Sequence, residues 1–233
     1  MFARLTRIGA LVALVVGPLT LVVTSIVQWT LQPTGPDPTT TAVAQQFPTA
    51  WMAVGLLSVL GPLVWLGGLP AAGALAVGRG LVLTRIGALV TGVGLSAAIG
   101  HLALFFGLFG TTALSGLDPA SIGSVEAAAD REPLGNMLLV LFLVAYSLGP
   151  ILLTVGLRIA RRVAVWVPIA AILTAGANLF GGPIAGVVQL VCLVAAWGAI
   201  VVAVARAGEG RRPAAPVVAS ASPAVSTATQ RGL

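Results

Sequence analysis

Lysine is absent from this sequence, cysteine, histidine and tyrosine occur once each, and only 8% of the 233 residues are charged. A soluble domain has about a quarter of its residues charged, so this chain has too few charges to cover itself with a polar surface. Hydrophobic residues make up 58% of it, and its mean hydropathy is +1.07. These totals predict an integral membrane protein, for which the bilayer is the solvent.

The scarce residue types exclude several classes of site. A single cysteine, Cys192, cannot form an intramolecular disulfide or a multi-cysteine metal site. A single histidine, His101, cannot assemble a zinc or paired-haem site. The chain has no P-loop, no GxSxG pattern and no intramembrane pair of carboxylates. We therefore expect no enzymatic activity, no metal and no cofactor.

The net charge of +6 does not indicate a nucleic-acid partner. All twelve basic residues are arginines, and they lie at the ends of apolar runs instead of forming a patch. We expect no nucleic acid among the partners, and the lipid bilayer as the main one.

Six apolar segments approach the ~20 residues that a helix needs to cross the bilayer. Helix is the expected form because an unpaired backbone amide costs several kcal/mol in lipid. The predicted fold is an all-α polytopic membrane helix bundle, with one transmembrane domain over residues 1–206. Its predicted spans are residues 8–28, 51–72, 86–108, 136–157, 163–180 and 184–205.

The distribution of arginines predicts that both termini are cytoplasmic. With the N-terminus inside and six spans, only Arg131 falls outside. By the positive-inside rule, the side of the membrane with the excess of arginines is the cytoplasmic side. The arginines on the inner side are Arg4, Arg7, Arg79, Arg85, Arg158, Arg161, Arg162, Arg206, Arg211, Arg212 and Arg231.

Three segments are predicted to lie outside the membrane. Residues 29–50 are rich in proline and threonine and form a first outer loop. Residues 111–135 form a second, within which a short helix should start near Asp118 and end near Ala129. Residues 207–233 lack an apolar period, which predicts a disordered cytoplasmic tail.

An exact repeat suggests internal duplication. The letters LTRIGALV occur at residues 5–12 and again at 83–90, and Leu-Gly-Pro recurs at 60–62 and 148–150. Since the corresponding helices run in the same direction, the two-helix repeats would be parallel. The glycines that precede prolines are either hinges for a gating motion or features of bent helices shaped for packing.

Small residues recur every four positions on the third predicted span. They are Thr84, Ala88, Gly92, Ser96 and Gly100, and Gly87, Gly94 and Ala98 lie close by. Small residues let helix backbones approach, so this span is predicted to be central in the bundle. Such faces also favour a homo-oligomer or a complex with another membrane protein.

A small number of polar residues lie in the outer half of the predicted bundle. His101 is 16 residues beyond Arg85, which is about 24 Å along a helix, and Asn178 lies equally far beyond Arg162. One hypothesis is a small polar pocket open to the outside; the alternative is separate interhelical hydrogen bonds of about 0.6 kcal/mol. The candidate pocket residues are His101, Asn178, Gln28, Gln189 and Tyr146.

The arrangement of a polar loop after the first span, a longer one after the third and a tight fifth–sixth hairpin resembles a bacterial family of multi-pass proteins that carry a domain of unknown function. The resemblance covers roughly residues 1–206, and the arginine, alanine, valine and glycine usage resembles an actinobacterium. It implies a protein of the bacterial cytoplasmic membrane and supplies no catalytic residues. We expect a structural, accessory or interaction protein; the alternatives are a permease or export-system subunit and, more weakly, an intramembrane lipid-acting enzyme.

Overall fold

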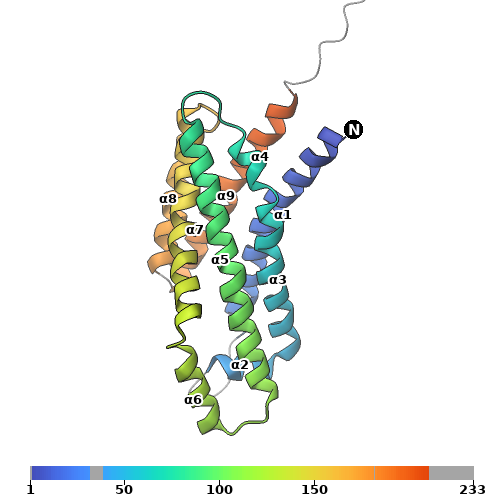
Figure 1. Ribbon diagram of the computed structural model, residues 1–233, viewed down its shortest axis with the longest axis vertical. Coiled ribbons are helices and arrows are strands. Elements are labelled where there is room, and N and C mark those ends of the chain that lie inside the picture. Colours follow the sequence, from blue (N-terminus) through green and yellow to red (C-terminus); the bar gives the residue numbers. More distant parts are fainter. Residues whose placement is uncertain (1, 32–38, 181, 210–233) are drawn as a thin grey trace, which may run out of the picture.

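A computed structural model describes residues 2–31, 39–180 and 182–209, and these residues form an all-α bundle, as predicted. The long helices are α1 (Phe2–Thr30), α3 (Pro48–Leu66), α5 (Leu81–Leu114), α7 (Pro133–Ile159) and α9 (Gly182–Glu209). The shorter ones are α2 (Thr40–Gln46), α4 (Leu69–Gly73), α6 (Pro119–Ala129) and α8 (Trp166–Phe180). Figure 1 shows an elongated bundle with α2 and α6 at one end.

Five of the six predicted spans are confirmed as helices long and apolar enough to cross a membrane, with α3 and α4 together making one of them. The predicted span at 163–180 is the exception, since its helix α8 has 15 residues. The span predicted at 51–72 bends at Gly67 and Gly68, where α3 ends and α4 begins. The span predicted at 86–108 extends to 34 residues.

The predicted loops hold more helix than expected. The first outer loop contains α2, whose N-cap is the Thr39 side chain. In the second, the predicted short helix is confirmed as α6. Its N-cap, Asp118, accepts hydrogen bonds from Ser121 Oγ and from the Ser121 and Ala120 amides, which hold the pKa of Asp118 below its ordinary value. Helix α9 continues to Glu209, past the predicted start of the tail, and residues 210–233 lie outside the described residues.

The helices are arranged as a closed ring in the order α1, α3, α5, α7, α8 and α9. The ring closes between α1 and α9 at two points. At one end Arg7 donates a hydrogen bond to the carbonyl oxygen of Ala205. At the other, Gly186 lies against the Trp29 ring. The start of α1 and the end of α9 therefore lie at the same end of the bundle (Figure 1); we call it the arginine end, because α5 starts and α7 ends there with Arg85 and Arg158.

Helices α5 and α7 touch backbone to backbone. A Cβ atom on Gly94 would lie 2.6 Å from the backbone nitrogen of Tyr146, and one on Gly156 would lie 2.5 Å from that of Thr84. Gly87 and Gly149 face Leu153 and Thr91 in the same way. The contacting glycines are spaced seven apart on each helix, the period that keeps one helix face against another.

Threonines fill the spaces between these glycines. Thr84 and Thr91 are fully buried, and their hydroxyls donate to the carbonyl oxygens of Gly80 and Gly87, each at 2.8 Å. A buried hydroxyl without a partner would be costly, but these bond within their own helix. The interface therefore combines close approach with satisfied polar groups.

Helices α1 and α3 also meet at glycines. Gly61 of the first Leu-Gly-Pro sequence faces the Thr20 side chain of α1, whereas Gly149 of the second faces the Thr91 backbone of α5. Gly17, which also precedes a proline, faces Trp65. These glycines are points of helix contact, which favours the packing interpretation over hinges. The two threonines do not occupy corresponding positions relative to the LTRIGALV repeat, and duplication stays a prediction.

The ring encloses an aromatic core. Trp65 of α3 lies at its centre with no exposed surface, and its ring packs edge-on against Trp197 of α9 at 4.7 Å and Tyr146 of α7 at 6.0 Å. A second cluster lies toward the α2 end, where Trp51 packs on Phe106 and donates to its carbonyl oxygen at 3.1 Å. The bundle is thus filled along its axis by large side chains from opposite helices.

The end opposite the arginines is held by one carboxylate. Glu126 of α6 accepts hydrogen bonds from the Thr41 hydroxyl at 2.6 Å and the Thr41 amide at 2.9 Å. Thr41 has no exposed surface, so water cannot replace Glu126 as the acceptor for its hydroxyl and amide. This contact fixes α6 against α2, which itself packs on α5.

The α5–α7 contact predicts opposite effects for two glycines of the same helix. Gly87→Ala places a methyl group against the Leu153 backbone, which cannot move without separating the helices, and should lower stability by about 1–3 kcal/mol. Gly107→Ala meets nothing within 4 Å and should raise stability by up to about 1 kcal/mol through helix propensity. Thermal unfolding in detergent measures both. Equal effects of the two changes would show that the close contact does not limit stability.

Candidate functional site

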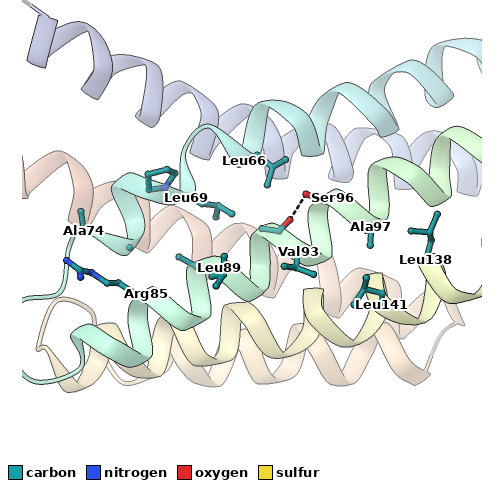
Figure 2. Close-up of a pocket in the computed structure, with 14 residues that line it drawn as sticks. Leu66, Leu69, Ala74, Arg85, Leu89, Val93, Ser96, Ala97, Leu138 and Leu141 are labelled. Carbon is teal, nitrogen blue, oxygen red and sulfur yellow. Dashed lines mark hydrogen bonds between the residues drawn. The ribbon is translucent and has the colours of Figure 1, made fainter.

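A lateral groove with a volume of about 880 Å³ lies over α5 (Figure 2). Its floor is Ala88, Gly92 and Ser96, one helical face at a spacing of four. We call it the α5 groove. Its remaining lining residues are Leu66, Leu69, Pro70, Gly73, Ala74, Arg85, Leu89, Val93, Ala97, Leu138 and Leu141.

Neighbouring helices raise the walls of the α5 groove. Leu66 and Leu69 stand on one side, from α3 and α4, and Leu138 and Leu141 stand on the other, from α7 (Figure 2). None of these leucines is distinguishable in the sequence from a residue that faces lipid or core. The sequence therefore indicates the floor of the groove through its small residues, but not its walls.

The chemistry of the α5 groove is almost wholly apolar. Arg85 is its one charged lining residue and lies exposed at the arginine end. The Ser96 hydroxyl donates to the carbonyl oxygen of Gly92 at 2.9 Å, so it is already satisfied (Figure 2). Such a surface can bind hydrocarbon or the face of another helix, and it offers no general base or nucleophile.

Only Thr84 of the predicted stripe of small residues lies in the close backbone contact between α5 and α7, opposite Gly156. Helix α5 contacts α2, α3, α4 and α7, but α3 also contacts four helices, so the predicted central position stays a prediction. Gly87, Thr91 and Gly94 also form the buried contact, whereas Gly92 is only partly buried and Ser96 is exposed. A spacing of exactly four drifts around a helix of 3.6 residues per turn, while alternating steps of three and four stay on one side. The two sets of small residues thus face different directions.

Two of the candidate polar residues are brought together. Gln189 of α9 donates from Nε2 to Oδ1 of Asn178 on α8 at 3.1 Å. Asn178 Nδ2 is buried and has no hydrogen-bond partner in the structure. The pair joins the two helices of the α8–α9 hairpin near its turn, where Gly182 has a positive φ of 84°.

The other candidates lie apart from this pair. His101 of α5 is hydrogen-bonded through Nδ1 to the carbonyl oxygen of Gly135 at the start of α7, at 3.1 Å. Tyr146 is buried in the central core, and its hydroxyl has no partner in the structure. Gln28 is exposed on α1. Their common participation in one polar pocket stays a prediction.

The centre of the bundle leaves little space. The cavity beside Tyr146, Thr154, Thr174 and Trp197 has a volume of about 10 Å³, enough for about one water molecule. Among the described residues, no group of three His, Cys, Asp or Glu side chains could hold a metal ion. The accessible hollows therefore lie on the periphery of the bundle.

No protein-family model, curated protein or solved structure matches this chain. Functional inference therefore rests on the geometry of the molecule itself, and above all on its lateral groove.

The Asn178–Gln189 hydrogen bond predicts a measurable coupling between two residues. Asn178→Leu and Gln189→Leu should each lower stability, because each leaves the other side chain without its hydrogen-bond partner. The double variant removes both groups, so it should lose less stability than the sum of the two single losses. We expect a coupling of about 0.6 kcal/mol, typical of hydrogen bonds between membrane helices. Thermal unfolding of the four proteins measures it. Strict additivity would show that the bond does not form.

Proposed function

We propose that the protein spans the bacterial cytoplasmic membrane six times, with both termini in the cytoplasm. Helix α8 occupies a place in the closed ring between α7 and α9, which supports its crossing. Its 15 residues cover only about 22 Å, but the apolar, non-helical residues Val163, Ala164 and Val165 precede it and lengthen the apolar segment. A bilayer thins locally to match such a length at modest cost.

The charges at the two ends support this orientation. Arg7, Arg85, Arg158 and Arg206 gather at the arginine end, whereas Glu126 and Asp118 lie at the end formed by α2 and α6. Arginines near the ends of spans favour the cytoplasmic side. The arginine end is therefore the cytoplasmic one in our proposal.

We infer that the protein is a non-enzymatic accessory protein that binds a transmembrane helix of another membrane protein. The α5 groove carries this inference. Its floor presents Ala88, Gly92 and Ser96 toward the bilayer, and small residues at this spacing are where membrane helices approach most closely. The α5–α7 contact uses small residues in the same role within the chain.

The shape of the α5 groove favours a different protein over a second copy as the occupant. Its leucine walls make it concave, and a two-fold dimer would bring two concave surfaces together. A single projecting helix complements it better. The packed interior around Trp65 and Trp197 lends no support to a permease or export path, and no described feature favours lipid chemistry.

Cysteine labelling tests the six-span arrangement. In a Cys192→Ser background, a membrane-impermeant maleimide added to intact bacteria should label Gly123→Cys, in exposed α6, and should not label Arg79→Cys or Ala207→Cys until the cells are lysed. If α8 does not cross, the 207 position alone changes side and is labelled in intact cells. Labelling at 79 in intact cells would instead invert the whole orientation.

Photo-crosslinking tests the proposed partner helix. A photoreactive residue at Ser96, in the groove floor, should give a cross-linked membrane protein that mass spectrometry identifies, whereas the same residue at Ile172, which is 51% exposed on α8, should not. Gly92→Leu fills the groove and should abolish the product, while Gly176→Leu, which meets nothing within 4 Å, should leave it unchanged. Cross-links only to a second copy or only to lipid would contradict a partner protein.

A further inference from the structure

A second hollow lies at the arginine end, between α9, the α7–α8 connection and the segment after α4. Its volume is about 810 Å³, and three arginines line it: Arg161, Arg162 and Arg206. None of the described residues that line it is acidic. We call it the basic groove. Three positive charges without a carboxylate among them make a site that attracts an anion.

The rest of the basic groove is apolar. Arg206, Val202 and Gly198 follow one face of α9 at a spacing of four, so this wall descends about 12 Å from the charged rim. At Gly198 an added Cβ would meet nothing within 4 Å, so its missing side chain leaves the wall open. Val167 forms part of the opposite wall, and Trp166 stands at the start of α8, where an indole suits the membrane interface.

Arg161 is held in a left-handed backbone conformation at the end of α7. Helix α7 ends in a Schellman motif: the Arg162 amide donates to the Leu157 carbonyl oxygen and the Arg161 amide to that of Arg158, each at 2.9 Å. Arg161 occupies the left-handed position, with φ at 55°. Glycine fits this position without strain, yet the chain places a charged side chain there, beside the groove.

We propose that the basic groove binds an anionic phospholipid. Its phosphate lies among Arg161, Arg162 and Arg206, whose guanidinium groups match phosphate oxygens in geometry and charge. An acyl chain follows the apolar face of α9 toward the middle of the bilayer. Basic pockets between membrane helices are suited to such headgroups. Only the choice of leaflet rests on the proposed orientation; the binding itself does not.

The strain at Arg161 provides a variant in which binding and stability should change in opposite directions. Arg161→Gly removes a phosphate ligand but relieves the left-handed backbone, so the purified full-length protein should be at least as stable as wild type. Native mass spectrometry after exchange between nanodiscs of phosphatidylglycerol and phosphatidylcholine measures lipid retention. We expect wild type to prefer phosphatidylglycerol, and Arg161→Gly and Arg206→Gln each to weaken that preference about tenfold.

The matched control is Arg158→Gln. Arg158 is exposed in the last turn of α7, close in sequence to Arg161, but does not line the basic groove. Its loss should leave the preference unchanged. Equal retention of both lipids by wild type, or an equal loss in Arg158→Gln, would overturn the proposal.

Inorganic phosphate separates a lipid site from a simple anion site. Millimolar phosphate should not raise the unfolding temperature in detergent, because it lacks the acyl chain, whereas added phosphatidylglycerol should. If phosphate alone stabilises wild type as much as the lipid does, the groove binds anions and the proposed lipid assignment is wrong. Neither result depends on the α5 groove or on a partner helix.

Discussion

The contact between α5 and α7 is the constraint on which the rest of the bundle depends. Where Gly87 and Gly94 meet the α7 backbone, no atom of a side chain separates the two helices. Membrane helices gain little from burying apolar surface, because lipid is equally apolar, so close van der Waals contact and satisfied polar groups must hold them together. The buried hydroxyls of Thr84 and Thr91 bond to their own helix, which lets two backbones approach without leaving a polar group unpaired.

This close approach also explains the α5 groove. A helix has room for more than one small-residue face, and on α5 the face that includes Gly94 is used against α7 while the face that includes Gly92 remains without a helix over it. Because α3, α4 and α7 all pack on α5, leucines from these helices stand on either side of that face. The groove is thus a geometric consequence of a recessed central helix, and its depth is set by its neighbours.

Composition and the lengths of the apolar runs were enough to predict an all-α bundle and its five helices that are long and apolar enough to cross a membrane, because hydrocarbon thickness fixes how long such a helix must be. The N-cap chemistry at Asp118 likewise predicted α6. Small residues in the sequence indicated both Gly87 and Ala88, and only the direction in which each faces distinguishes the α7 contact from the groove floor. The basic groove escaped prediction because Arg206 and Arg161 are 45 positions apart and sequence shows only that each ends a helix.

The strained backbone at Arg161 separates a structural arginine from a functional one. An arginine that only anchors a helix end has no reason to occupy a left-handed position, where glycine forms the same Schellman motif without strain. Arg158 and Arg85 lie near the end and the start of their helices in ordinary helical conformation, and in the proposed orientation they would anchor these helices on the cytoplasmic side. The proposed basic groove gives the side chain at this position a role that glycine could not fill. With the interior filled by Trp65 and its neighbours, that role lies at the surface, where the bundle meets lipid.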